Sequence, residues 1–116
     1  MQRKFRLTRS EDFKRVRRSG KSYAHPLVVL IVQVHDQPRL KIGVAAGRTV
    51  GTAVYRNRAK RLLREALRPL IPNIRSGLDL ILIARPSLVS ATLEETRQAL
   101  LTLLQRAQIL IPLNES

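Results

Sequence analysis

Apolar side chains recur at helical spacing in three parts of the chain. The first part, residues 9–18, carries a short stripe formed by Phe13 and Val16. The second stripe belongs to a central helix and comprises Ala59, Leu62, Leu63, Ala66, Leu67 and Leu70. The third stripe belongs to the last helix and comprises Leu93, Thr96, Leu100, Leu103, Leu104 and Ala107. Each stripe is one face of an amphipathic helix, so three helices are predicted to bury one side each.

The boundaries of these helices are marked by local signals. Thr8 and Glu11 form a capping-box pattern before the first helix, which is predicted to end near Gly20. Thr92 and Glu95 form a second capping box before the last helix. The central helix is predicted to end at the prolines Pro69 and Pro72, because proline cannot donate a helical hydrogen bond.

Three segments between the helices have the composition of strands. Residues 22–34 are mostly apolar and β-branched, but Pro26 interrupts them, which leaves open whether the first strand is split. Residues 41–46 read as a returning strand, and residues 78–84 as a fully apolar strand at the centre of a sheet. The order α-β-β-α-β-α predicts an α+β domain, a two-layer sandwich with helices against one mixed sheet.

The 116 residues are enough for one domain that buries roughly two thirds of its unfolded surface. We therefore expect a single domain over residues 1–116, with residues 1–8 and 112–116 as flexible tails. The chain has no cysteine, which excludes a disulfide framework and a cysteine-based zinc site. No secretory signal or membrane-spanning run is found, so we expect a cytoplasmic protein with no membrane partner.

The net charge of +14 is concentrated in one part of the chain. Residues 1–68 carry 18 basic and 4 acidic side chains, whereas residues 69–116 carry 4 of each. Solubility needs a much smaller charge, and no basic helix has the Trp or Phe face that would enter an anionic membrane. The charge therefore favours a nucleic acid as the partner.

The kind of nucleic acid is narrowed by the basic helix and by the scarcity of aromatic residues. Basic residues on the central helix lie opposite its apolar stripe, and like charges at this spacing destabilise a helix unless an anion offsets them. Strands flank this helix, which argues against a DNA-binding helix-turn-helix. Only 3% of residues are aromatic, too few for an RRM-type single-strand binder. Folded RNA, held through its phosphates, fits best.

The sequence offers no evident catalytic group of its own. A single unbroken strand would separate His25 and His35 by roughly 33 Å, too far for the two to act on one phosphate. Asp79 is the one acid inside an apolar strand, where a capping or edge role is expected. The three glycines within residues 43–51 are spaced four apart and resemble a phosphate cradle. The Lys-Ser/Thr that follows in a Walker A loop is missing. We expect no catalytic residue and no metal site.

One string is more specific than any of these patterns. VGTAVYRNRAKRLLREALR resembles the signature of the bacterial ribonuclease P protein family, in which Gly-x-Ala-Val-x-Arg-Asn-Arg-x-Lys-Arg opens the central helix. LTRSEDFKRV, LKIGVAAGR, LDLILIAR and TLEETRQALLTLL resemble the family's first helix, second hairpin strand, late strand and last helix. The resemblance implies a left-handed βαβ crossover at the central helix and a role as the protein cofactor of a catalytic RNA.

The resemblance also implies two sets of site residues. The residues expected to contact the catalytic RNA are Arg48, Arg56, Asn57, Arg58, Lys60, Arg61, Arg64 and Arg68. Those expected to line a cleft for the single-stranded 5′ leader of precursor tRNA are Phe13, Lys14, Arg17, Tyr23 and Ile31. Arg17 and Ile31 stand where many family members have aromatic residues, so leader binding is expected to rely more on charge. Gly47-Arg48-Thr49 replaces a common Ser-Lys-Lys, so one basic contact is expected to be missing.

The function implied is that of the protein subunit of ribonuclease P, an endoribonuclease that removes the 5′ leader from precursor tRNA. The RNA would carry the chemistry with Mg²⁺, and the protein would bind no cofactor by itself. Its partners would be the catalytic RNA, in a 1:1 complex with a monomeric protein, and precursor tRNA, with no DNA. A ribosomal or ribosome-associated structural RNA binder is the alternative. A free-standing nuclease is disfavoured by the missing acidic cluster.

Overall fold

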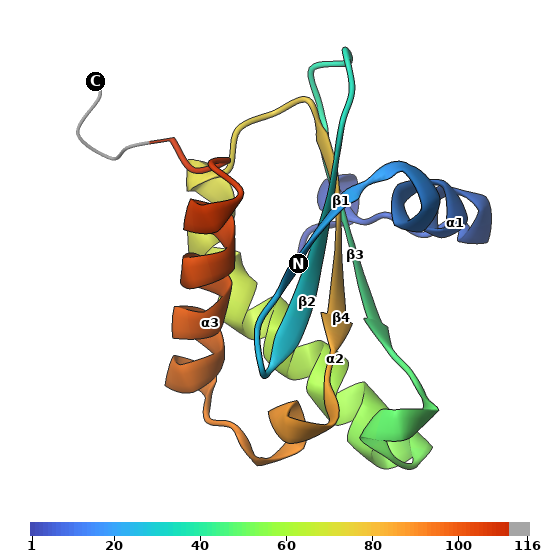
Figure 1. Cartoon of the computed structure of the whole chain (residues 1–116), viewed down its shortest axis with the longest axis vertical. Helices are drawn as coiled ribbons and strands as arrows, with labels where there is room; N and C mark the ends of the chain where they lie inside the picture. Colours follow the sequence, from blue (N-terminus) through green and yellow to red (C-terminus); the bar gives the residue numbers. More distant parts are fainter. Residues whose placement is uncertain (112–116) are drawn as a thin grey trace.

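Four strands form one mixed sheet in the computed structural model, which describes residues 1–111 (Figure 1). They are β1 (Lys21–Ala24), β2 (Val28–Val34), β3 (Leu40–Ala46) and β4 (Leu78–Ala84). The strand order is β1-β2-β4-β3, in which β2 is antiparallel to β1 and β4, and β3 is parallel to β4. β4 therefore lies between two neighbours, as its uninterrupted apolar sequence predicts.

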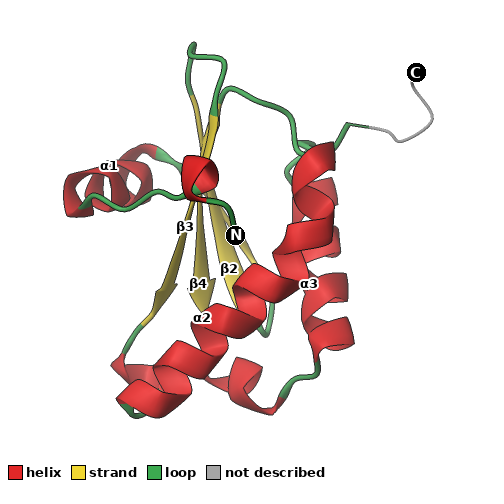
Figure 2. Ribbon diagram, turned by 180° about the vertical axis from the view of Figure 1, so that it is seen from behind, coloured by secondary structure: helices red, strands yellow, loops and turns green. Residues whose placement is uncertain are grey.

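Three α-helices cover the two faces of this sheet (Figure 2). They are α1 (Ser10–Ser19), α2 (Ala53–Leu67) and α3 (Leu93–Arg106). Leu30 and Leu80 belong to the main core beneath α2 and α3, whereas the alternate residues Ile31 and Ile81 pack beneath α1. Alternate residues of a strand point to opposite faces, so α1 lies on the other side of the sheet from α2 and α3. The α+β class with a mixed sheet is confirmed, and α1 adds a partial layer to it.

The connection from β3 through α2 to β4 is a left-handed crossover. In Figure 1 both strands run downward, β4 lies to the left of β3, and α2 returns behind the sheet. Figure 2 shows the same helix in front of the strands. Almost all βαβ connections have the opposite hand, so this handedness, which the family resemblance implied, is an uncommon feature of the fold.

The first predicted strand is split, and its two parts reverse direction. β1 and β2 form an antiparallel hairpin in which Lys21 pairs with Val32 and Ala24 with Val29. The turn between them contains Pro26, and the His25 backbone N–H donates to the Val28 carbonyl at 3.0 Å. Proline has no N–H to give to a sheet, which explains why the pairing stops here.

Residues 1–8, for which the sequence predicts a flexible tail, contact the edge of the sheet. A short 3₁₀ turn, Arg3–Phe5, is followed by a parallel bridge between Arg6 and Ile42, and the Leu7 N–H donates to the Ile42 carbonyl at 2.9 Å. Leu7 is buried beneath α1. The N-terminal segment thus lies along the edge of β3. The other predicted tail, residues 112–116, lies outside the described residues.

The two predicted capping boxes have different outcomes. At α3 the box is complete: the Glu95 N–H donates to Thr92 Oγ1 at 3.0 Å, and the Thr92 N–H donates to Glu95 Oε1 at 2.9 Å. At α1 the prediction is wrong, because Arg9 is the N-cap residue and no side chain caps the helix. The predicted stripe of α3 is correct except at its start, where Leu93 is exposed.

The central helix ends as its sequence predicts. After Leu67 the chain tightens into a 3₁₀ segment, Arg68–Asn73, that contains both prolines. Two further 3₁₀ turns, Arg48–Val50 and Pro86–Ser90, precede α2 and follow β4. Ala59, Leu63, Ala66 and Leu67 are buried against the sheet and α3, so the opposite face of α2 is turned outward.

Candidate nucleic-acid interface

The outward face of α2 carries a dense group of basic side chains, which we call the α2 basic surface. It comprises Arg56, Asn57, Arg58, Lys60, Arg61 and Arg64. Asn57, Arg58 and Arg61 are exposed, and the other three are half-buried. Within residues 1–111 none of its basic side chains forms an ion pair with an acid. The helix therefore presents unneutralised charge on the side opposite its buried stripe, as its sequence predicts.

Arg68 and Arg48 differ from the rest of the predicted set. Arg68 is paired with Glu65 one turn earlier, which raises the pKa of Arg68 and lowers that of Glu65. Its charge is therefore partly neutralised within the protein. Arg48 is exposed in the 3₁₀ turn that leads to α2, close in the chain to the helix N-terminus. The structure thus places Arg48 beside the α2 basic surface and leaves Arg68 at its far end.

A hollow of about 680 Å³ lies where α2 faces the N-terminal segment. Four arginines line it, namely Arg6, Arg58, Arg61 and Arg64. The other lining residues are Met1, Leu62, Glu65 and Leu93. Burial lowers the pKa of Arg64, and the charge of Arg6 lowers it further. The Nε of Arg64 is also buried without a hydrogen-bond partner. Converging like charges and an unsatisfied N–H favour an anion such as an RNA phosphate at this position.

Two residues at the start of α2 lie outside the set predicted to contact the catalytic RNA. Val54 and Tyr55 are exposed although their types are usually buried, and the Tyr55 ring lies against Gly51, whose φ is +133°. An exposed aromatic ring among basic side chains is typical of surfaces that stack on nucleotides. The proximity of Tyr55 to the Arg-Asn-Arg stretch is the signal that could have identified it.

On the other side of the sheet, α1 brings together only part of the predicted leader site. The Phe13 ring lies against Gly43, and Val16 packs on Ile31 and Ile81. Beyond α1, Val29 and Ile83 are only partly covered. Phe13 and Arg17 are four residues apart on the same side of the helix. They flank this open part of the sheet face, which we call the α1-side sheet face.

The remaining predicted leader residues lie elsewhere. Ile31 is 5% exposed and forms the floor beneath α1, so it is not available for contact. Lys14 is exposed on the side of α1 that faces away from the sheet. Tyr23 pairs with Leu30 and packs on the main core, so it lies on the α2 and α3 side of the sheet. The structure does not bring Tyr23 into one cleft with Phe13.

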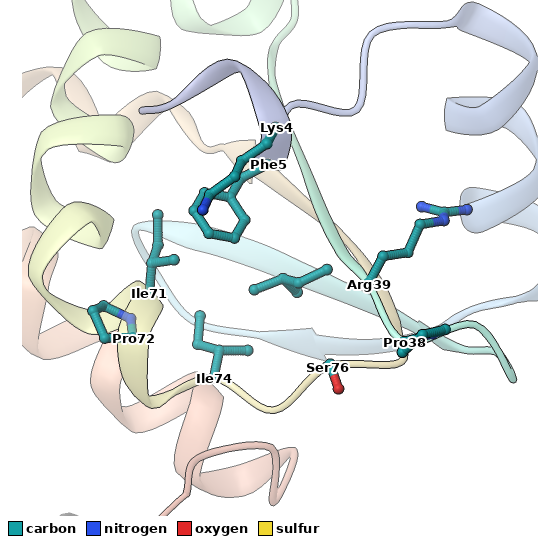
Figure 3. Close-up of a pocket in the computed structure, with 9 residues that line it drawn as sticks. Lys4, Phe5, Pro38, Arg39, Ile71, Pro72, Ile74 and Ser76 are labelled. Carbon is teal, nitrogen blue, oxygen red and sulfur yellow. The ribbon is translucent and has the colours of Figure 1, made fainter.

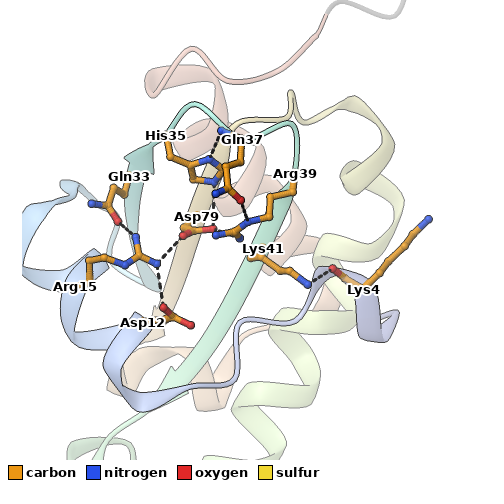
Figure 4. Close-up of polar contacts among 9 residues, drawn as sticks. All are labelled: Lys4, Asp12, Arg15, Gln33, His35, Gln37, Arg39, Lys41 and Asp79. Carbon is orange, nitrogen blue, oxygen red and sulfur yellow. Dashed lines mark hydrogen bonds and ion pairs between the residues drawn. The ribbon is translucent and has the colours of Figure 1, made fainter.

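Asp79 is neither a cap nor an edge residue, contrary to the expectation from its sequence. Its carboxylate is fully buried on the α1 side of the central strand, where two arginines bind it (Figure 4). Arg15 Nη2 donates to Asp79 Oδ2 at 2.8 Å, and Arg39 Nη1 donates to Oδ1 at 2.9 Å. The two arginines satisfy the buried carboxylate from α1 and from the loop before β3.

A second hollow, of about 430 Å³, lies away from the α2 basic surface and is lined by both apolar and polar residues (Figure 3). Phe5 of the N-terminal 3₁₀ turn points into it, toward Ile71 and Ile74. No acid lines it. It seats the N-terminal segment against the end of α2 and contains no set of groups suited to catalysis.

The two histidines lie at opposite ends of one strand. His25 lies in the turn before β2 and His35 follows the end of β2, so the length of that strand separates them. No group of three or more His, Asp or Glu side chains within residues 1–111 lies close enough to hold a metal ion. None of the helices in this part of the chain is long and apolar enough to cross a membrane.

The chain is similar to proteins of one family in both sequence and structure. The family model described as Ribonuclease P matches residues 1–108. The ribonuclease P protein component of Herpetosiphon aurantiacus is 44% identical over 109 residues, which cover 94% of this chain and 89% of that protein. The corresponding protein of Chloroflexus aurantiacus is 37% identical over 118 residues, with 100% and 87% covered.

Two solved structures have the same fold. The RNase P protein of Staphylococcus aureus superposes with a TM-score of 0.80 at 26% identity, covering 91% of this chain and 97% of that one. The RNase P protein of Thermotoga maritima superposes with a TM-score of 0.77 at 30% identity, covering 87% and 96%. The similarity therefore includes the sheet and the helices that carry the basic residues.

Proposed function

This chain belongs to the ribonuclease P protein family, and from that premise we propose that it holds both the catalytic RNA and the 5′ leader of precursor tRNA. The α2 basic surface binds the catalytic RNA. The α1-side sheet face binds the single-stranded leader. The protein thereby assists the endonucleolytic step that produces the mature 5′ end of the tRNA.

The unneutralised charge of α2 is the observation that carries this proposal. Its basic side chains project from one rigid helix whose other face is buried, so binding does not require the backbone to be ordered first. The hollow lined by Arg6 and Arg64 gives the surface a concave centre suited to a phosphate. The Nε of Arg64 has no hydrogen-bond partner within the protein. Folded RNA presents phosphates that such basic side chains can neutralise, with release of counterions.

Leader binding on the other side of the sheet follows from different chemistry. Phe13 offers an aromatic edge, Arg17 a charge, and the half-covered Val29 and Ile83 an apolar floor. Single-stranded nucleotides expose both a base face and a phosphate, which such a mixture can contact together. Phe13 is the aromatic side chain of this face, and because Ile31 is covered by α1, charge carries a larger share of the binding.

In this proposal the RNA cuts the phosphodiester bond. The described residues offer no acid cluster for Mg²⁺ and no histidine pair, so they do not fit a resident magnesium site. The holoenzyme's Mg²⁺ is held by the RNA. The protein contributes phosphate neutralisation, which reduces the Mg²⁺ concentration that the RNA needs for folding and for substrate binding.

A ribosomal RNA binder would also display a basic helix, so the partner must be identified directly. The full-length protein is crosslinked in cells of its own species, and the bound RNA is sequenced. We expect enrichment of one structured catalytic RNA and of tRNA precursors that still carry a leader. Enrichment of ribosomal RNA alone would replace the proposal with the alternative. A variant with Arg58, Arg61 and Arg64 changed to Gln keeps the buried stripe and serves as the binding-deficient control.

A further inference from the structure

Asp79 is the one charged residue of β4, and its side chain is buried. β4 is central in the sheet, and the other residues of Leu78–Ala84 are apolar, yet the Asp79 side chain has no exposed surface. A buried carboxylate is strongly disfavoured unless charged partners and hydrogen bonds satisfy it. Asp79 faces the α1 side of β4, whereas Leu80 and Leu82 belong to different rows and pack in the main core on the opposite side. The partners of Asp79 therefore indicate what it does.

These partners connect α1 to two strands. Arg15 Nη2 donates to Asp79 Oδ2 at 2.8 Å, and the same guanidinium donates through Nη1 to Gln33 Oε1 of β2 (Figure 4). Its Nη2 also lies 3.2 Å from Asp12 Oδ1, one turn earlier on α1. The hydrogen bond to Asp79 raises the pKa of Arg15. Arg39 Nη1 donates to the second Asp79 oxygen at 2.9 Å, which balances two acids with two arginines.

This network lies on one flank of α1, and the residues proposed to bind the leader lie on the other. At 100° per residue, Arg15 stands about 100° to one side of the buried Val16, whereas Phe13 and Arg17 stand about 60° and 100° to the other. The sheet rows follow the same order. Gln33 and Asp79 are register partners in one row, and Gly43, beneath Phe13, lies in the next.

Apart from this network, one apolar ridge holds α1 on the sheet, formed by Val16 and by the Phe13 ring against Gly43. Val16 is its one fully buried side chain, and the helix has ten residues with no side-chain cap at its start. Helices this short owe their stability to tertiary contacts. A single apolar ridge allows a helix to roll, whereas a guanidinium held in two directions by Asp79 and Gln33 does not.

We infer that Arg15 and Asp79 are a positioning pair for the 5′ leader. Their ion pair fixes the rotation of α1, so that Phe13 and Arg17 face the α1-side sheet face. This inference rests on the proposed leader-binding function and adds to it the residues that orient the site without touching the RNA. The pair lies on the opposite side of the sheet from α2, so binding of the catalytic RNA does not depend on it.

The test uses the reconstituted holoenzyme and two precursor tRNAs, one with a leader of several nucleotides and one with a single-nucleotide leader. The ratio of their dissociation constants measures the leader contribution. Arg15→Met is expected to reduce this ratio by about three- to tenfold, which lies within the range for mutations that weaken coupling between sites. Asp79→Asn should produce a similar loss, and the double variant should add little to either, because the two residues act as one unit.

Two matched variants and one control measurement separate positioning from a general effect. Arg18→Met removes the same charge from the side of α1 that faces away from the sheet, and it should change the ratio by less than about twofold. Arg15→Lys keeps a charge beside Asp79 and should recover part of the leader contribution. Affinity for the catalytic RNA alone should stay within about twofold for Arg15→Met, which shows that the variant is folded.

The possible results distinguish failure of leader binding from failure of the positioning pair. A wild-type ratio near one would refute leader binding, which is part of the proposed function. A normal wild-type ratio that Arg15→Met leaves unchanged would refute the positioning pair alone. Equal losses of leader affinity and of catalytic-RNA affinity in Arg15→Met would reduce the pair to a folding role and would also overturn the inference.

Discussion

The ring of Phe13 lies so close to Gly43 that a Cβ atom at position 43 would stand only 2.8 Å from the ring Cε1 and closer still to Cζ. Real Cβ atoms essentially never approach another atom so closely, so the pair is packed without spare room. Gly43 is thus required by the helix above it and not by its own backbone. Its absent side chain is what lets α1 approach the sheet and bring Phe13 to the edge of the α1-side sheet face.

Gly43→Ala should therefore displace Phe13 and destabilise the fold by about 1–3 kcal/mol, the usual cost of overpacking. Thermal or urea unfolding measures the change. In a Phe13→Ala background the same substitution should cost much less, because the ring that it would strike is gone. Additive free energies of unfolding in the double variant would show that the two residues do not share this contact.

Phe13 and Tyr23 should behave differently in leader binding, although the sequence groups them. Phe13→Ala should weaken binding of leader-bearing precursor by about 1 kcal/mol or more, as loss of a stacking platform does, and leave mature tRNA binding unchanged. Tyr23→Ala should leave this difference intact, because its ring lies on the α2 and α3 side of the sheet. Fluorescence titration with leader-bearing precursor and with mature tRNA measures both affinities for each variant. Equal effects of the two variants would contradict the placement of Tyr23.

Arg64→Ala should reduce the salt dependence of binding to the catalytic RNA. Removing one basic side chain from a phosphate makes the slope of log K against log salt shallower by about one unit. Arg75→Ala is the matched control, since Arg75 is an exposed arginine in the electrically neutral part of the chain. Titrations at several salt concentrations provide the slopes. An Arg64→Ala slope equal to that of the wild type would remove Arg64 from the interface.

The capping box of α3 should make stability depend on pH in the acid range. The N–H of Thr92 holds the pKa of Glu95 below its usual value. A lowered pKa means that the stabilisation is present above the unfolded-state pKa, about 4.3, and is lost as the pH falls through the folded-state value. Glu95→Gln should therefore lower the melting temperature near neutral pH and converge with the wild type in acid. A constant difference across the acid range would contradict this assignment.

Thr92→Ala removes the other half of the same cap. It should cost about 1 kcal/mol of unfolding free energy, which is typical for loss of an N-cap side chain. Thr8→Ala is the control, because Thr8 has the same sequence context but Arg9 is the N-cap residue of α1. Thr8→Ala should change the unfolding free energy by less than about 0.5 kcal/mol. A larger loss for Thr8→Ala than for Thr92→Ala would reverse the two assignments.

The helices and the central strand could be predicted because their signals are local. The stripe through Ala59 and Leu63 and the apolar run of Leu78–Ala84 each lie within one element, and both are buried as expected. The basic face of α2 follows from the same periodicity, since residues between the apolar positions must point outward. These patterns determine which surface can meet RNA.

The features that could not be predicted from the sequence depend on how its strands and helices pair. The side of the sheet on which Tyr23 lies is set by the hairpin register that pairs it with Leu30, and a one-residue shift would reverse it. The role of Asp79 depends on Arg15, 64 positions away, and on Arg39, 40 positions away. An isolated acid in an apolar strand indicates that a partner exists, but only the fold identifies it.

Reconstituted cleavage tests the central claim most directly, namely that this chain assists an RNA catalyst and cuts no RNA itself. Precursor tRNA is incubated at low Mg²⁺ with the protein alone, with the catalytic RNA of the same species alone, and with both. We predict that the protein alone leaves the precursor intact and that the two together remove the 5′ leader far faster than the RNA alone. Cleavage by the protein alone, or no acceleration of the RNA, would contradict this claim.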